Sequence, residues 1–71
     1  MTLPTIRVNG ESESLGAEQT LEALLAEKAV DTGQRGIAVA LNGAVVPRAV
    51  WRATALRSGD SVEIVRARQG G

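Results

Sequence analysis

Polar and apolar residues alternate over Thr5-Ile6-Arg7-Val8, as they do in a strand with one buried face. Asn9-Gly10 follows, and this pair favours a two-residue hairpin turn because both turn positions need a positive φ angle. The returning stretch from Glu11 to Leu15 is polar, which is typical of a strand at a sheet edge, where charge discourages further pairing. The pattern predicts a hairpin whose second strand lies at an edge.

The segment TLEALLAEKAV, residues 20–30, has the spacing of a short amphipathic helix. Thr20 is a suitable N-cap, and Gly33 can take the left-handed conformation that ends a helix. One apolar stripe is formed by Leu21, Leu24, Leu25 and Ala29. So short a helix is unstable alone, and we therefore expect it to pack on a sheet.

A second hairpin is predicted after the helix. In Ile37-Ala38-Val39-Ala40-Leu41 large apolar residues alternate with alanines, so both faces are apolar and a central strand covered at least partly on both sides is expected. Asn42-Gly43 repeats the turn signal, and residues 44–46 return until Pro47 removes a ladder donor.

The rest of the chain holds a connector and one more strand. Residues 48–56 form a short irregular or single-turn segment, and Ser58-Gly59-Asp60 has the composition of a turn. In the final strand, Val62-Glu63-Ile64-Val65, Val62 and Ile64 face inward by parity. Trp51 in the connector is either a core residue or part of a docking face, and we favour the core.

The order hairpin, helix, hairpin, connector, strand predicts an α+β fold of the β-grasp type. A single amphipathic helix and a single sheet each have one apolar side, so the helix lies across a mixed sheet of four to five strands. A split βαβ sandwich is the competing fold, but it normally has a second helix, and no second helix is apparent in the sequence. We assign residues 1–66 to this domain and residues 67–71 to a flexible C-terminal tail.

Composition excludes several kinds of function. The 71 residues contain no His and no Cys, so a His-activated nucleophile, a thiolate and an ordinary zinc site are excluded. Trp51 is the one aromatic residue and the net charge is zero, which argues against nucleic acid and anionic lipid as partners. No apolar run approaches a membrane span, and no signal peptide is apparent. We expect a cytoplasmic protein, monomeric when free, with no catalytic residue or bound metal.

The charged residues are unevenly distributed and allow two interpretations. From residue 35 onward the sequence has six arginines and two carboxylates, which gives this part a net charge of plus four, whereas the earlier part is acidic. The arginines are either a solvated surface or a docking face for an acidic partner. Glu11 and Glu13 share one face of their strand; edge-strand solubility explains them better than an acid/base or metal pair.

The chain ends in RARQGG, which follows the last strand without a turn signal. Two terminal glycines can arise by chance. The functional interpretation is that Gly70 and Gly71, having no Cβ, enter a narrow channel of a partner and bring a terminal carboxylate to a nucleotide. Arg66 and Arg68 are candidates for contacts that offset the entropy lost by the tail on threading.

The sequence resembles the thiamine-biosynthesis sulfur carrier family, ThiS, over nearly its whole length. VALNGAVVPRAVW and LRSGDSVEIVRARQGG carry the most specific likeness, and IRVNGE with TLEALL match the N-terminal half. The molybdopterin synthase small subunit is a relative with the same fold and ending. Its approach to the glycines contains a proline, which RARQGG lacks, so the thiamine branch is favoured.

This resemblance implies that the protein is a co-substrate and not an enzyme. An E1-like enzyme would adenylate the carboxylate of Gly71, a sulfur donor system would convert it to a thiocarboxylate, and thiazole synthase would take the sulfur. The tail glycines, Gly70 and Gly71, would thread into the partner, with Arg66, Arg68 and Gln69 as docking candidates. ATP and magnesium would bind the activating enzyme, and this chain would hold no cofactor.

Three alternative functions remain at this point. A molybdopterin-synthase-type carrier would use the same chemistry with another acceptor. A ubiquitin-like modifier would form isopeptide bonds with target proteins. A non-covalent interaction module would not need the terminal glycines at all, because fold alone does not determine function.

Overall fold

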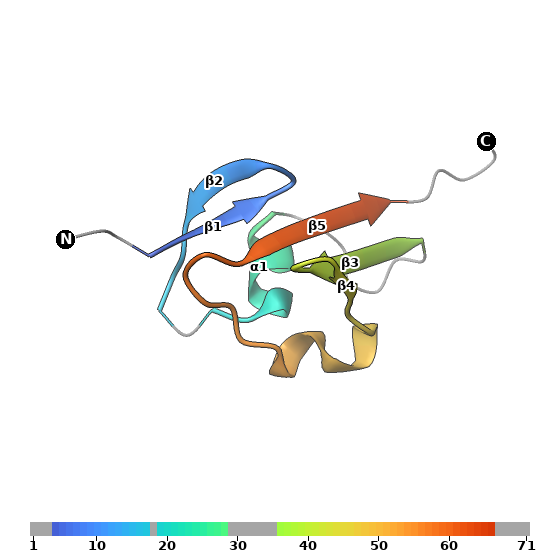
Figure 1. Cartoon of the computed structure of the whole chain (residues 1–71). Helices are drawn as coiled ribbons and strands as arrows, with labels where there is room; N and C mark the ends of the chain where they lie inside the picture. The colour runs from blue at the N-terminus through green and yellow to red at the C-terminus, as the bar shows by residue number, and fades with distance from the viewer. Residues whose placement is uncertain (1–3, 18, 29–35, 67–71) are drawn as a thin grey trace.

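The last strand of the chain, β5 (Ser61–Arg66), lies at the centre of the structure. The computed structural model describes residues 4–17, 19–28 and 36–66. The other strands in these ranges are β1 (Thr5–Val8), β2 (Glu11–Ser14), β3 (Ile37–Leu41) and β4 (Ala44–Val45). They form one five-stranded sheet in the order β2-β1-β5-β3-β4, and Figure 1 shows β5 passing between β1 and β3.

The sheet is mixed, as the β-grasp prediction requires. β1 pairs with β5 in parallel, whereas β1 with β2, β3 with β4 and β3 with β5 are antiparallel. The helix α1 (Leu21–Glu27) follows the first hairpin and packs its apolar residues on one face of the sheet. β2 lies at an edge, as its polar sequence predicts. The predicted β-grasp fold is confirmed.

Two interactions fix the start of α1: its N-cap and a hydrogen bond to the connector between β4 and β5. The Thr20 hydroxyl accepts a hydrogen bond from the Ala23 amide at 3.2 Å, which satisfies one of the unpaired amides of the first turn. Leu21 N–H donates to the Thr54 carbonyl at 2.9 Å, so the helix start is tied to the connector. Lys28 is the C-cap. Ala29 and Gly33, predicted for the stripe and the helix end, lie outside the described residues.

The core lies between α1, the sheet and the connector. The connector forms a 3-10 helix, η1 (Arg48–Ala53), which is longer than the single turn expected. The buried residues come from β1, α1, β3, η1, β5 and the segment between η1 and β5: Ile6, Val8, Leu21, Leu24, Leu25, Val39, Trp51, Leu56 and Val62. Val62 is fully buried and Ile64 packs against this cluster, so the predicted inward side of β5 is confirmed.

The expectation that both faces of β3 are covered at least partly holds at Ala40 but is wrong at Ala38. β3 is an interior strand, and Val39 on its helix-facing side is completely buried. Ala38, on the opposite side, is exposed, and Ala40 is half-buried. The reason is that the described residues contain a single α-helix, which packs on one face of the sheet and leaves the other face to solvent.

Trp51 is a core residue, and its docking interpretation is wrong. Its side chain is 2% exposed, and the indole N–H donates to the Val46 carbonyl at 2.8 Å. The Arg48 guanidinium lies 5.1 Å from the ring centroid, within the range of a cation–π contact. Trp51 thereby holds η1 to the segment after β4.

Among the described residues, no helix is long and apolar enough to cross a bilayer.

Replacing Trp51 tests this packing. Trp51→Ala should lower the free energy of unfolding by about 3–5 kcal/mol, because it removes a buried indole and leaves a cavity. Trp51→Phe should cost about 1–3 kcal/mol, since an aromatic ring remains but the Val46 carbonyl loses its donor. Urea unfolding followed by far-UV circular dichroism measures both, as the fluorescent residue is itself changed.

Val50→Ala is the matched control, because Val50 precedes Trp51 in η1 and is 44% exposed. It should change the unfolding free energy by less than about 0.5 kcal/mol. A Trp51→Ala protein as stable as the Val50→Ala protein would contradict the core role.

Candidate functional site

The candidate site is the C-terminal end of β5, because β5 leads directly into residues 67–71 of the chain. Arg66 is the last residue of β5 and lies opposite Ile37 of β3. Four of the residues predicted for the site, Arg68, Gln69, Gly70 and Gly71, lie outside the described residues. Arg66 is therefore the predicted site residue that the structure places.

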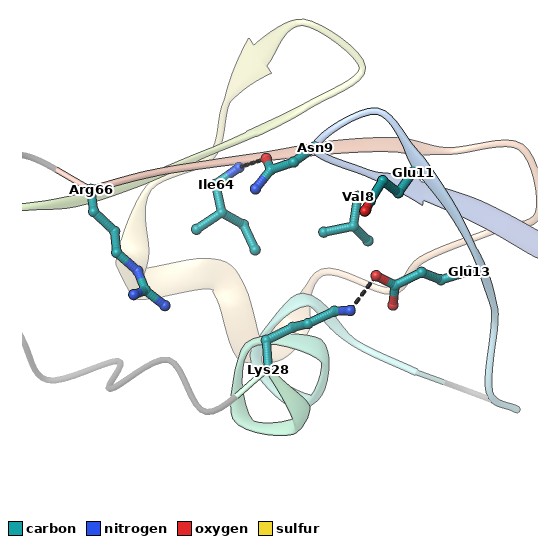
Figure 2. A pocket seen from close by; sticks show the side chains of 7 residues that line it. All are labelled: Val8, Asn9, Glu11, Glu13, Lys28, Ile64 and Arg66. Carbon is teal, nitrogen blue, oxygen red and sulfur yellow. Dashed lines mark hydrogen bonds and ion pairs between the residues drawn. The ribbon is translucent and has the colours of Figure 1, made fainter.

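The Arg66 side chain lies on the helix side of the sheet, over an open pocket. By parity it shares this side with Val62 and Ile64, and Figure 2 shows it beside the end of β5, facing the same space as Lys28. The pocket is lined by Val8, Asn9, Glu11, Glu13, Lys28, Ile64 and Arg66. Its walls carry both charges, and its apolar lining comes from β1 and β5.

Glu11 and Glu13 line this pocket together, on one face of β2 as predicted. The Glu13 carboxylate forms an ion pair with the Lys28 ammonium, which links the edge strand β2 to the C-terminal end of α1 (Figure 2). Within residues 4–17, 19–28 and 36–66, no group of three or more His, Asp or Glu residues is placed to hold a metal ion. The paired carboxylate favours a structural role for Glu13.

The opposite face of the sheet carries an exposed apolar patch beside the end of β5. Val65 is 59% exposed and Val45 is 75% exposed. The strand register places Ala38 opposite Val65 and Ala40 opposite Val45, so these small and branched side chains share one face. We call Ala38, Ala40, Val45 and Val65 the outer apolar face.

This outer apolar face is a candidate docking surface. Exposed apolar side chains that gather next to one another on a small protein mark interaction sites more often than scattered ones do. The sequence contained the signal, because alanines alternate with large residues in β3. The alternation predicts at least partial cover on both faces, whereas the alanine side is exposed at Ala38 and half-buried at Ala40.

Two asparagines bind β5 through their side chains, which the sequence analysis did not predict. Asn9 Oδ1 accepts a hydrogen bond from the Ile64 amide at 2.8 Å, and Asn42 Oδ1 accepts one from the Ser61 amide at 2.9 Å. Both residues were identified as turn formers, and both have the predicted positive φ, 51° and 52°. A turn motif gives no signal for a third strand beside it, so this second role needed the structure.

Known proteins of similar sequence and structure agree with this fold and indicate the family. A sequence model described as the ThiS family matches residues 6–71. The crystal structure of a thiamine biosynthesis protein (ThiS) from Geobacter metallireducens is 33% identical, with a TM-score of 0.77, covering 94% of this chain and 99% of that one. A solution structure of a thiamine biosynthesis protein from the same organism has a TM-score of 0.75 at 33% identity, covering 94% and 87% of the two chains.

A longer relative is also similar. A thiazole synthase from Paramagnetospirillum magneticum is 41% identical over 64 residues, which is 90% of this chain. The chain spans 19% of the length of that protein.

The family match covers nearly the whole chain, and the mixed five-stranded sheet with one helix in the described residues is the β-grasp fold that the sequence predicts. The chain belongs to the ThiS family of thiamine-biosynthesis proteins.

Proposed function

We propose that this protein is a sulfur carrier for the thiazole ring of thiamine and that the carboxyl group of Gly71 carries the sulfur. The observation on which the proposal rests is that the ThiS family match reaches residue 71 and so includes Gly70 and Gly71. The likeness to solved thiamine biosynthesis proteins over 94% of the chain supports the same pathway. The protein acts as a co-substrate and supplies no catalytic group.

The proposed chemistry takes place in the partners. The Gly71 carboxylate attacks the α-phosphorus of ATP in an E1-like enzyme, and pyrophosphate leaves. Hydrosulfide supplied by the donor system then attacks the acyl carbon and forms the C–S bond, AMP leaves as the acyl C–O bond breaks, and loss of the sulfur-bound proton gives the thiocarboxylate. ATP and magnesium belong to the activating enzyme, where the metal neutralises phosphate charge. The carrier contributes the carboxylate and the surface by which it is recognised.

We further propose that the outer apolar face docks on these partners. One of its residues, Val65, lies on β5 directly before Arg66, the last described residue, and the others lie on the neighbouring strands β3 and β4. Burying two exposed valines and two alanines gives affinity. The polar contacts proposed for Arg66, Arg68 and Gln69 are made separately, at the end of β5, because the Arg66 side chain lies on the helix side of the sheet. Docking close to the tail keeps the distance from surface to reacting carboxylate short.

Thiazole synthase is the proposed acceptor of the sulfur. The relative from Paramagnetospirillum magneticum bears that name and contains a 64-residue stretch similar to this chain within a much longer protein. A carrier-like segment and the remainder of that protein are thus held in one polypeptide. We infer that this chain acts with a separate or linked thiazole synthase in the same way.

The mass of the carrier tests the proposed modification. Incubating the 71-residue protein with its cognate activating enzyme, ATP, magnesium and a sulfur donor should raise its intact mass by about 16 Da, as sulfur replaces one oxygen. Deleting Gly71 should abolish the shift, and omitting ATP should do the same. A wild-type chain whose mass stays unchanged with an active enzyme would count against the proposal.

The competing functions give different products in the same experiment. A ubiquitin-like modifier would produce conjugates of higher mass on target lysines. A non-covalent module would bind its partner equally well after both glycines are removed.

Val65→Asp tests the docking face. The charge should leave the unfolding free energy within about 0.5 kcal/mol of wild type, because the side chain is exposed. It should raise the KM of the activating enzyme for the carrier by about tenfold, because a charge would be buried in an apolar interface. Steady-state pyrophosphate release measures this effect.

Val50→Asp is the matched control for charge, since Val50 is also exposed but lies in η1. Its KM should stay within about twofold of wild type. Equal effects of the two substitutions would show that the outer apolar face has no special part in docking.

A further inference from the structure

Asn9 and Asn42 accept equivalent hydrogen bonds from the backbone of β5, one on each side of the strand. Each is the first residue of an Asn-Gly turn, with the following glycine at a φ of 86° or 87°. Such a turn rotates the asparagine carbonyl out of the plane in which a strand residue would use it. In both cases the side-chain Oδ1 accepts the bond from β5 that the backbone carbonyl would accept in a regular ladder.

On the β1 side, Asn9 extends the parallel ladder beyond the end of its own strand. The register pairs Val8 with Val62, and Asn9 N–H donates to the Val62 carbonyl at 2.9 Å. In a regular parallel ladder the next bond would run from the Ile64 amide to the Asn9 carbonyl. Instead the Ile64 amide donates to Asn9 Oδ1 at 2.8 Å, and Figure 2 shows this carboxamide beside Ile64.

On the β3 side, Asn42 does the same at the other end of β5. Its N–H donates to the Ser61 carbonyl at 2.8 Å, and the Ser61 amide donates to Asn42 Oδ1 at 2.9 Å. Its Nδ2 also donates to an Asp60 carboxylate oxygen at 3.0 Å. Asn42 therefore holds the beginning of β5, whereas Asn9 holds the half that ends at Arg66.

The C-terminal half of β5 has unequal support on its two sides. β3 pairs with β5 as far as Arg66, opposite Ile37. On the other side the β1 register ends at Val62. Beyond Val62, within the described part of the chain, the β5 backbone bonds the β1–β2 hairpin through the Ile64 amide, which donates to Asn9 Oδ1. At this point the Asn9 side-chain oxygen thus takes the place that a backbone carbonyl would have if β1 were one residue longer.

We propose that Asn9 is a positioning residue for activation of the carrier: by holding Ile64, it fixes the direction in which β5 delivers residues 67–71 to the activating enzyme. The inference rests on the proposed function. A reacting group must be held in a narrow range of geometry, and small displacements are costly even when they arise outside the reacting centre. Without the Asn9 acceptor, β5 loses this bond to the β1–β2 hairpin two residues before Arg66, and the end of the strand is then held on its β3 side.

Asn9→Gly and Asn42→Gly are the paired variants that test this role. Glycine keeps the positive φ of each turn and removes the Oδ1 acceptor. Asn42→Gly loses at least as many hydrogen bonds, because Asn42 also bonds Asp60. Its loss of stability should therefore equal or exceed that of Asn9→Gly, and any difference in activation cannot be attributed to global unfolding.

The expected result separates the two positions. Asn9→Gly should lower kcat/KM for adenylation by about tenfold and leave it at that level under conditions where the variant is fully folded. Asn42→Gly should remain within about twofold of wild type. Asn9→Asp, which keeps an acceptor and suits the same turn, should restore most of the activity.

Hydrogen exchange of individual amides gives a readout that does not depend on the enzyme. In Asn9→Gly the Ile64 amide should exchange about tenfold faster relative to the amide of the buried residue Leu24, which donates to the Thr20 carbonyl, whereas in Asn42→Gly the Ile64 ratio should stay at the wild-type value. Equal losses of kcat/KM in the two glycine variants, or unchanged exchange at Ile64 in Asn9→Gly, would overturn the proposal. A wild-type chain that is never adenylated would instead overturn the proposed function, and the exchange ratios would show whether Asn9 holds the strand.

Discussion

The pairing of β5 with both β1 and β3 is the constraint on which the rest of the structure depends. It joins the two hairpins into one sheet, because β1 lies on one side of β5 and β3 on the other. The same strand supplies Val62 to the core and ends at Arg66, where the tail begins. A change that weakens this strand therefore affects the fold and the proposed reaction together, although its residues contribute to each in different measure.

Much of this architecture could be predicted because its signals are local. The two Asn-Gly turns, the Thr20 cap and the leucine stripe each depend on neighbours within a few residues, and the structure contains all of them. The single α-helix then left few ways to cover a sheet. The buried position of Trp51 was favoured for a similar reason, since a chain with no Phe or Tyr has few large residues with which to fill a core.

The features that could not be predicted depend on residues far apart in the sequence. The contact of Asn9 with Ile64 joins residues 55 positions apart, and only the register of β1 on β5 brings them together. The uncovered alanine side of β3 depends on which face α1 selects, and the alternation itself is the same for either face. The ion pair of Lys28 with Glu13 likewise needs the helix end to lie over the edge strand.

A small domain has few residues to divide between stability and recognition. In β5 the two roles belong to alternate residues, because these face opposite sides of the sheet. Val62 and Ile64 face α1 and the core, whereas Glu63 and Val65 face the open side. Because successive side chains point to opposite faces, a partner that approaches the outer side meets residues whose replacement does not disturb packing. The short side chains of Ala38 and Ala40 in β3 project little from that side of the sheet, beside Val65. A bulky pair at these positions would protrude beside Val65, and in the docking that we propose it would hold the partner away from β5.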